Sequence, residues 1–263
     1  MSQFKKRLAN IIEKTGGTIE EDLFVTKPGV IITEVTTSTN EGKELYELMN
    51  CGYGDDYLQS AEFKGRLTYL SFKDGGSDLQ ESMNFHHKMI HEAKHLSIYA
   101  GTYVTFLLAG VSVETSKELV AHREATVARL TSSATLAMSE CLYRIQGKSV
   151  DHQKTMIKEF LKLRDANKEH WDKKAGANSE QLSTEFFNML NLACKCVALT
   201  FTISVKDLHK LLIGRMASRG NETEVQEVCT MMCQLAHERF PEIINEPAAY
   251  RKIDDNGEKL NIQ

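Results

Sequence analysis

The sequence predicts an α+β protein in which a small, mostly antiparallel sheet packs against a largely helical remainder. Two segments predict the strands: the β-rich GVIITEVTT that begins at Gly29, and the extended apolar stretch SIYAGTYVTFLLAGVSV at 97–113. A third observation predicts the helices, because nearly the whole chain after Glu114 has helical periodicity. Sheet and helices together indicate the α+β class.

The segments before residue 97 alternate between helix and strand. We expect a helix over 3–14, terminated by the Gly16-Gly17 pair, and a second helix over 42–52. GRLTYLSF at 65–72 resembles a strand. The segment at 77–96 is predicted to be a helix with Ser77 as its N-cap.

The second half of the chain is predicted to be helical, followed by a polar tail from about residue 245. With three prolines and no Pro-rich or Ser/Gly-rich run, no linker is visible, so we expect residues 1–263 to form a single domain. The predicted helices cover about 114–145, 150–173, 179–200, 204–216 and 221–238.

Composition excludes several classes of protein. The 263 residues are 41% hydrophobic, enough for one substantial core. A net charge of −4 argues against binding to a nucleic-acid backbone. No apolar run reaches the roughly 18 residues of a membrane span, and the basic N-terminal segment has no apolar signal region. We therefore expect a cytoplasmic protein that binds neither membrane nor nucleic acid.

The six cysteines do not form a metal-binding pattern. Cys229 and Cys233 share one face of a predicted helix, whereas Cys194 and Cys196 point apart on another, and no C-x-x-C pair is present. We expect buried free thiols that act as small hydrophobic side chains. The full set is Cys51, Cys141, Cys194, Cys196, Cys229 and Cys233.

HEAKH at 91–95 matches the H-E-x-x-H signature of zinc proteases. On a continuous helix His91 and His95 could bind one zinc ion while Glu92 served as general base. The alternative is a polar helix face without a metal, and the sequence singles out no third ligand. We predict no metal site.

The stretch ELVAHREATVARLTSS at 118–133 combines an apolar stripe with many polar groups. Read as a helix, it places Val120, Val127 and Leu130 on one face, with Arg123 among them. One interpretation is an ordinary amphipathic helix whose Arg123 reaches out to water. The other is a phosphate site, because guanidinium and hydroxyl donors are concentrated here. The donors are Arg123, Arg129, Thr131, Ser132 and Ser133.

The same stretch resembles the central motif of the flavin-dependent thymidylate synthases, the ThyX family, written R-H-R-x-x-S-x-N-x-x-S-x-R. His122 and Arg123 match, and Thr126 and Thr131 stand for the two serines. The first and last arginines are replaced by Ala121 and Ser133. The remaining differences are Ala128 for Asn and Arg129 for the usual acidic residue.

Three further segments are similar to family motifs in the same order, so that the resemblance spans about 66–243. HLSIYAGTYVTF at 95–106 resembles H-x-T-P-x-E-H-x-x-x-T-F, with Ala100 and Gly101 in place of Glu-His. FTISVKDLHKLLIGR at 201–215 resembles W-x-x-N-x-R-x-L-x-x-F-L-x-x-R. NETEVQEVCTMMCQLAHERFPEI at 221–243 resembles the closing A-Q-x-E-I-R helix.

The resemblance implies a ThyX-like fold and an enzyme that methylates dUMP at C5, with methylenetetrahydrofolate and NADPH as co-substrates and hydride from reduced FAD. It also implies a homotetramer with sites between subunits. Carried over residue by residue, it implies flavin contacts from Ser97, His122, Arg123, Lys206 and His209. Contacts to a pyrimidine nucleoside monophosphate are implied for Glu118, Arg129, Thr131, Ser132, Asn188 and Arg215.

The departures from the family motifs leave other functions open. The family's phosphate-binding Arg has become Ser133, while Arg129 lies four positions earlier, which suggests a relocated anion site. Asn188 stands where an Arg faces uracil in the family, and Asn offers both a donor and an acceptor. A pyrimidine nucleotide hydroxymethylase or other altered-substrate relative is therefore one alternative, and a non-catalytic binding protein on the same fold is another. The catalytic residues are left unassigned, as flavin chemistry needs no protein nucleophile.

Overall fold

The computed structural model describes residues 3–21, 24–49, 51, 54–69, 71–72, 78–130, 142–144, 149–174, 195–216 and 223–250. The chain divides into two compact units, each discontinuous in sequence. Unit 1 comprises Met1–Ile31, Phe106–Phe201 and Asn221–Val228, and unit 2 comprises Ile32–Thr105, Thr202–Gly220 and Cys229–Gln263. The predicted α+β class is confirmed.

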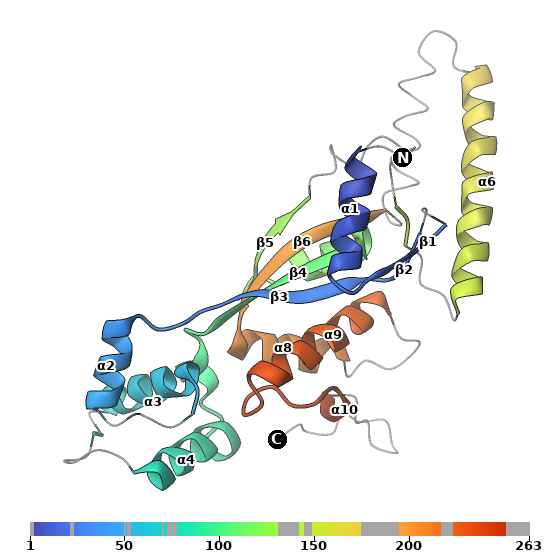
Figure 1. The fold of residues 1–263 in the computed structure, drawn as a ribbon. Coiled ribbons are helices and arrows are strands. Elements are labelled where there is room, and N and C mark those ends of the chain that lie inside the picture. Colours follow the sequence, from blue (N-terminus) through green and yellow to red (C-terminus); the bar gives the residue numbers. More distant parts are fainter. Residues whose placement is uncertain are drawn as a thin grey trace, which may run out of the picture. The chain divides into compact units, whose positions relative to one another are not determined.

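Helices and strands are interleaved along the chain (Figure 1). The helices are α1 (Gln3–Lys14), α2 (Asn40–Leu48), α3 (Asp56–Tyr69), α4 (Leu79–His87), the π-helix η1 (Lys88–Glu92), the 3-10 helix η2 (Leu96–Tyr99), α5 (Val113–Val120), α6 (Val150–Lys174), α8 (Val205–Met216), α9 (Glu224–Arg239) and α10 (Pro247–Tyr250). The strands are β1 (Thr18–Glu20), β2 (Phe24–Lys27), β3 (Gly29–Val35), β4 (Tyr103–Ser112), β5 (Thr126–Arg129) and β6 (Cys196–Ser204).

The main sheet has four strands in the order β3-β4-β6-β5, so its two central strands come from segments more than 80 residues apart in the sequence. β4 and β6 are largely buried and carry the apolar side chains of the sheet. A separate two-stranded sheet pairs β1 antiparallel with β2, with Ile19 opposite Val25 and Glu20 opposite Phe24.

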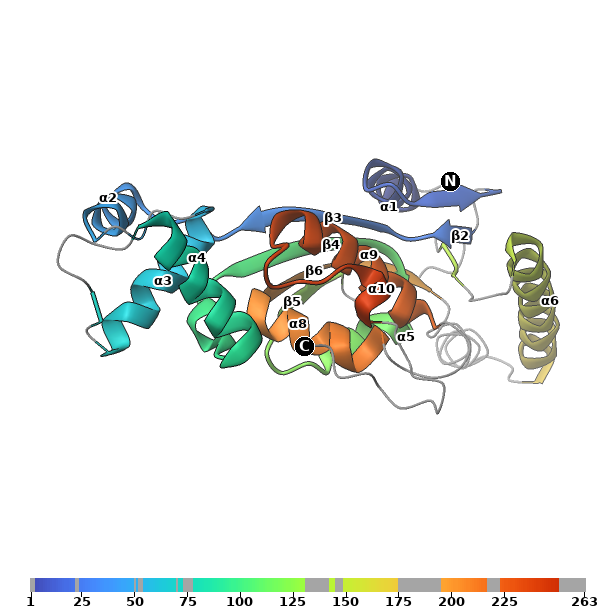
Figure 2. The ribbon, with the colours of Figure 1, turned by 90° about the horizontal axis from the view of Figure 1, so that it is seen from below.

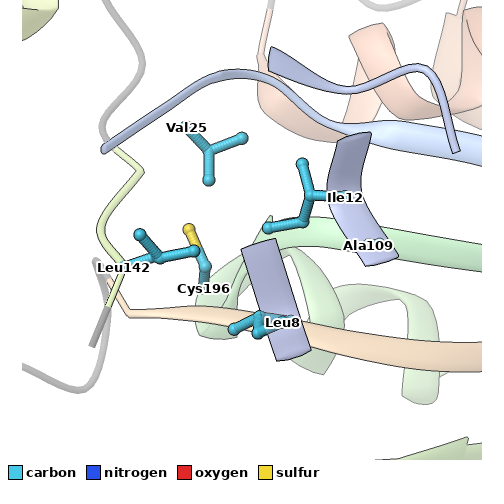
Figure 3. Close-up of a cluster of buried hydrophobic side chains, with 6 residues drawn as sticks. All are labelled: Leu8, Ile12, Val25, Ala109, Leu142 and Cys196. Atoms are coloured by element: carbon cyan, nitrogen blue, oxygen red, sulfur yellow. The ribbon is translucent and has the colours of Figure 1, made fainter. Parts of the chain in front are cut away.

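Helix α1 forms the core of unit 1 together with the sheet. Its apolar residues Leu8 and Ile12 lie one turn apart on the buried face, where they meet Val25 of β2 and Ala109 of β4 (Figure 3). Gly110 follows with a φ of +78°, and a Cβ there would lie 3.0 Å from a Val25 methyl group and 3.1 Å from Ile12 Cδ1. A glycine is needed at this point because the backbone is left-handed and the helix approaches closely.

A buried ion pair holds the 142–144 segment within unit 1. The Arg144 side chain is almost fully buried, and its Nε lies 2.9 Å from Glu224 Oε1. Its guanidinium also pairs with Glu227, and the backbone N–H of Ser112 donates to the same Glu224 oxygen at 2.8 Å. Because the charges are neutralised and hydrogen-bonded, they can be tolerated in the interior.

Unit 2 is mainly helical. Along α8 the buried side chains Leu208, Leu211 and Leu212 recur at helical spacing, as expected for an inward face. Ser204 caps this helix: its Oγ accepts from the Asp207 N–H at 3.1 Å and donates to the Asp207 carboxylate at 2.6 Å. Figure 2 shows α10 beside α8, and a hydrogen bond between the Tyr250 hydroxyl and the His209 ring joins them.

Four sequence-based predictions of local structure are wrong. Residues 65–69 of the predicted strand over 65–72 form the end of helix α3, on whose buried side Glu62 and Arg66 pair one turn apart; Leu70 lies outside the described residues. Ser77 is not the N-cap of α4, because Asp78 accepts the Glu81 N–H at 2.8 Å. The remaining errors lie in two predicted helices. The helix over 114–145 ends at Val120 and is followed by β5, with 131–141 and 145 outside the described residues. The helix over 179–200 is wrong from Cys196, where β6 begins, and 179–194 lie outside the described residues.

Both errors after residue 114 have the same physical cause. The Leu130 N–H donates to the Ala198 carbonyl at 3.0 Å, so the end of β5 is paired with β6 across the sheet. Such long-range pairing cannot be read from local periodicity, and it overrides local helix propensity.

The buried thiols agree with the sequence-based prediction where they are described. Cys51, Cys196, Cys229 and Cys233 are buried thiols that form no disulfide, and the latter two share helix α9. Cys196 lies on a strand rather than on the expected helix, while Cys141 and Cys194 fall outside the described residues. No described helix has the length and apolar character needed to cross a membrane.

Candidate functional site

The motif residues His122 and Arg123 lie in a turn, not on a continuous helix. Helix α5 begins at the N-cap Ser112, whose Oγ accepts the Thr115 N–H at 3.1 Å, and it ends at Val120. The turn that follows is closed by hydrogen bonds from His122 N–H to Leu119 and from Ala125 N–H to His122. The Arg123 side chain is exposed there, whereas His122 is half-buried.

Arg129 ends strand β5 and contacts the hydroxyl face of α5. Its Nη1 donates to Ser116 Oγ at 3.0 Å, and Ser116 Oγ donates to the Val113 carbonyl at 2.7 Å. Ser116 is completely buried, while Arg129 is exposed. Among the residues that the structure describes, no carboxylate forms an ion pair with Arg129. One edge of its guanidinium is thereby held, and the N–H groups on the other edge can receive an anion.

Glu118, also predicted to contact the nucleotide, is half-buried on α5. Three further residues predicted to contact the nucleotide lie outside the described part of the chain: Thr131, Ser132 and Asn188. Ser133 also lies outside it. In unit 1, Arg129 is thus hydrogen-bonded to helix α5. His122 and Arg123 lie in the turn that connects α5 to the strand β5 on which Arg129 lies.

The predicted residues of unit 2 lie on α8 and η2. Lys206 and Arg215 are half-buried at the two ends of α8, and Ser97 is exposed on η2. His209 has a structural partner, because its Nδ1 lies 2.8 Å from the Tyr250 hydroxyl. Burial lowers the pKa of His209, which favours the neutral imidazole.

Unit 2 also contains a hydroxyl-rich pocket of about 310 Å³ that sequence reasoning missed. Its walls include the Thr36–Thr39 loop before α2, Ser60 and Lys64 of α3, and Gly101 and Thr102 before β4. A run of four hydroxyl residues, TTST at 36–39, was the signal in the sequence. That signal was ambiguous, because such residues also mark ordinary turns and N-caps, and Thr39 does cap α2.

A buried polar network lies elsewhere in unit 2 and was also missed. Glu62 accepts hydrogen bonds from Arg66 Nε at 2.7 Å and from Ser82 Oγ at 2.9 Å. His86 Nε2 lies 4.0 Å from Glu62 Oε2, and His86 Nδ1 lies 2.8 Å from the Tyr99 hydroxyl. Burial, with a further contribution from Arg66, lowers the pKa of His86 to about 4. The imidazole is therefore neutral at physiological pH.

The geometry removes the argument for zinc from HEAKH. The π-helix η1 ends at Glu92, and Lys94 adopts a left-handed φ of 53°, so His91 and His95 do not lie on one continuous helix. His91 instead packs against His87 with ring centroids 4.9 Å apart. Within the described ranges, no group of three His, Cys, Asp or Glu side chains could hold a metal ion.

Comparison with known proteins places these residues in a family. The model of the Thy1 family, described as thymidylate synthase complementing protein, matches residues 51–242, which is more than half of the chain. The chain belongs to this family. The predicted resemblance to ThyX is thereby confirmed at the level of family and fold.

Two solved ThyX structures from Helicobacter pylori are similar to this Thy1 family member. One, described as a complex with FAD and dUMP, is 16% identical, with a TM-score of 0.55, and the match covers 82% of this chain and 96% of that one. The other, also complexed with FAD and dUMP, is 15% identical, with a TM-score of 0.52 and coverage of 82% and 97%. Identity this low shows a shared fold alone. No curated protein sequence matches the chain.

Proposed function

We propose that this Thy1 family member is a flavin-dependent thymidylate synthase that transfers a one-carbon unit from methylenetetrahydrofolate to C5 of dUMP. The observation that carries the proposal is the family match over 51–242, which includes the His122-Arg123 pair. The similar Helicobacter pylori structures hold FAD and dUMP, which supports the same pair of ligands here. FAD, when bound, supplies the hydride after reduction by NADPH.

The donor set of the α5–β5 turn fits an anionic cofactor. The exposed Arg123 offers a planar fork of N–H donors, which suits phosphate oxygens, and His122 adds an imidazole beside it. Among the described residues Arg123 forms no ion pair with a carboxylate, so no described acidic side chain neutralises its charge. We assign both residues, with Ser97, Lys206 and His209, to flavin binding.

The nucleotide phosphate is assigned to Arg129, with Thr131 and Ser132 beside it in the sequence. The hydrogen bond to buried Ser116 orients the guanidinium and reduces the rotamer entropy that ligand binding would otherwise remove. Glu118, Asn188 and Arg215 complete the proposed contacts to a pyrimidine nucleoside monophosphate. The proposed assembly is a homotetramer.

Two measurements on the purified full chain test the proposal. The visible absorbance spectrum reports whether flavin is bound, before and after incubation with FAD. Release of tritium from C5-labelled dUMP, with methylenetetrahydrofolate and NADPH present, reports the reaction itself. Flavin binding together with release from dUMP is the expected result. A protein that binds no flavin and releases no tritium would contradict the proposal.

A second candidate function is favoured by Ala100 and Gly101, which stand where the family carries Glu-His. Loss of that pair suits a ThyX-fold protein that binds pyrimidine nucleotides without flavin, or one with an altered substrate such as a hydroxymethylase. Labelled dCMP in the same assay separates these candidates. Release from dCMP but not dUMP indicates an altered substrate, and nucleotide binding without flavin indicates a binding protein.

A further inference from the structure

The pocket of unit 2 is built for a polar ligand. Eight of its twelve lining residues carry a hydroxyl group, and a single lysine, Lys64, lines it with them. Its volume of about 310 Å³ lies near the lower end of the range for small-molecule sites. It is larger than the space that a single small ion occupies. Its ring-bearing residues, Tyr46 and Tyr57, add apolar surface at one side.

Two of the hydroxyls, on otherwise buried residues, have no hydrogen-bond partner among the described residues. Ser60 is 8% exposed and Thr102 is 4% exposed, and both line the pocket. Neither oxygen is among the described buried polar atoms that lack a partner, so both hydroxyls reach the open space of the pocket although the rest of each residue is buried. Both belong to the pocket wall, and a bound ligand with acceptor oxygens would satisfy them.

Lys64 provides the positive charge. It projects from α3 one turn after Ser60, and its Nζ reaches Gly101: a Cβ built on that glycine would lie 2.6 Å from the ammonium nitrogen. In the part of the chain that the structure describes, no carboxylate forms an ion pair with Lys64. An ammonium group that is half-buried and not paired with an acid favours an anion beside it.

Asp56, the acidic residue in the wall, is already engaged. Its Oδ2 accepts the backbone N–H of Ser38 at 2.5 Å, which fixes the Thr36–Thr39 loop against the start of α3. Its Oδ1 has essentially no surface accessible to solvent. The carboxylate therefore shapes the wall, while the groups available to a ligand are the donors of Lys64, Ser60 and Thr102.

We propose that this pocket binds the phosphate group of a nucleotide, with Lys64 supplying the charge, Ser60 and Thr102 donating hydrogen bonds, and Tyr46 lying beside the remainder of the ligand. The combination of one ammonium and two hydroxyl donors suits phosphate oxygens, which are strong acceptors. The site goes beyond the proposed function and does not depend on it, because none of these residues is among those assigned to flavin or dUMP. Thr102 lies within the 95–106 motif segment, but Ser60, Lys64 and Tyr46 lie outside every motif.

The test is calorimetric titration of the full chain with AMP, adenosine, FMN, riboflavin and inorganic phosphate. Each phosphorylated probe is compared with its unphosphorylated partner in wild type and in Lys64→Met. Lys64→Met should bind AMP and FMN roughly 10- to 150-fold more weakly than wild type, because this is the loss expected when a hydrogen bond to a charged group is removed. Adenosine and riboflavin should bind equally to both proteins. Binding of inorganic phosphate alone would show that the site selects the ion and not a nucleotide, which would overturn the nucleotide part of the proposal.

Matched variants separate ligand binding from folding. Lys64→Arg should retain most of the affinity, and Lys43→Met, which removes an exposed lysine of α2 outside the pocket, should change nothing. Ser60→Ala and Thr102→Val should each lower the affinity for the phosphorylated probes without lowering the Tm, because these hydroxyls have no partner to lose among the described residues.

A double-mutant cycle tests whether Gly101 affects ligand binding through Lys64. Gly101→Ala should displace the ammonium and weaken AMP binding in wild type, but have no further effect in Lys64→Met. Equal AMP affinity of wild type and Lys64→Met, or a wild type that binds none of the phosphorylated probes, would overturn the site. Both results leave the proposed reaction untouched, since flavin absorbance and tritium release are measured separately.

Discussion

The exposed guanidinium of Arg129 donates a hydrogen bond of 3.0 Å to the hydroxyl of the fully buried Ser116. The bond links strand β5 to helix α5, two elements that the sequence suggested were one continuous helix. It also means that Arg129 presents its free N–H groups in a restricted orientation, whereas an exposed arginine on a helix would sample many rotamers.

Removing this guanidinium should weaken binding of a nucleoside monophosphate but not of its nucleoside. For Arg129→Ala we expect a loss of about 1.5 to 3 kcal/mol, roughly 10- to 150-fold in Kd, for dUMP, with deoxyuridine unaffected. Titrating both ligands against wild type and variant measures the difference. If both ligands weaken alike, or neither does, Arg129 does not bind the phosphate. Ser116→Ala is the matched control for orientation, and it should lower dUMP affinity by a smaller factor.

Arg123→Ala should lower flavin occupancy while leaving the fold intact. The side chain is exposed in the α5–β5 turn, and substitutions at such surface positions usually change the free energy of unfolding by no more than about 0.5 kcal/mol. Flavin content from the visible spectrum and Tm from thermal unfolding are measured on the same sample. Arg7→Ala, an exposed arginine of α1, is the control and should alter neither. A parallel fall of Tm and flavin content in Arg123→Ala would assign the residue to stability instead.

The buried His86 predicts loss of stability in acid. Its pKa in the folded protein, about 4, lies below the ordinary value of 6.5, so the unfolded chain binds a proton that the folded protein excludes. The stability that follows is therefore complete above pH 6.5 and is lost as the pH falls from 6.5 towards 4, with a slope of at most about 1.4 kcal/mol for each pH unit.

The pH dependence is measured by urea unfolding at a series of pH values in wild type and His86→Asn. The asparagine can keep a hydrogen bond to Tyr99 but does not titrate, so its curve should be flatter over this range. His87→Asn, which changes the exposed neighbour, should follow wild type. Identical slopes for wild type and His86→Asn would show that His86 is not the group responsible.

Arg144 should be among the most costly residues to truncate. Arg144→Ala leaves Glu224 buried without its counter-charge, which in comparable sites costs about 3 to 5 kcal/mol. Denaturant unfolding gives the free energy directly. Lys158→Ala, which breaks an exposed pair with Glu21 at 3.5 Å, should cost less than about 1 kcal/mol. A loss for Arg144→Ala as small as that for Lys158→Ala would mean that water reaches and solvates Glu224.

The sequence by itself determined the class of the protein, its family, and those elements whose pattern is local. The helix over 3–14 was predicted with its observed bounds, and α6, α8 and α9 lie close to their expected positions. These elements depend on caps and on apolar residues three or four positions apart, all within one segment of chain. Collinear motifs were sufficient for the family even where single motifs had diverged, because their order adds information that none has alone.

Only the tertiary structure decided the boundary between α5 and β5, the strand at Cys196–Ser204, and the polar sites of unit 2. Val127 and Val197 are compatible with either helix or strand by themselves, and the neighbouring strand of the sheet selects between the two. Ser60 and Lys64 lie one turn apart on α3, but Thr102 comes from a distant segment, so no periodicity along the chain links all three. What makes them a candidate site is the shared pocket and the absence of described partners, and both are properties of packing that a linear sequence does not contain.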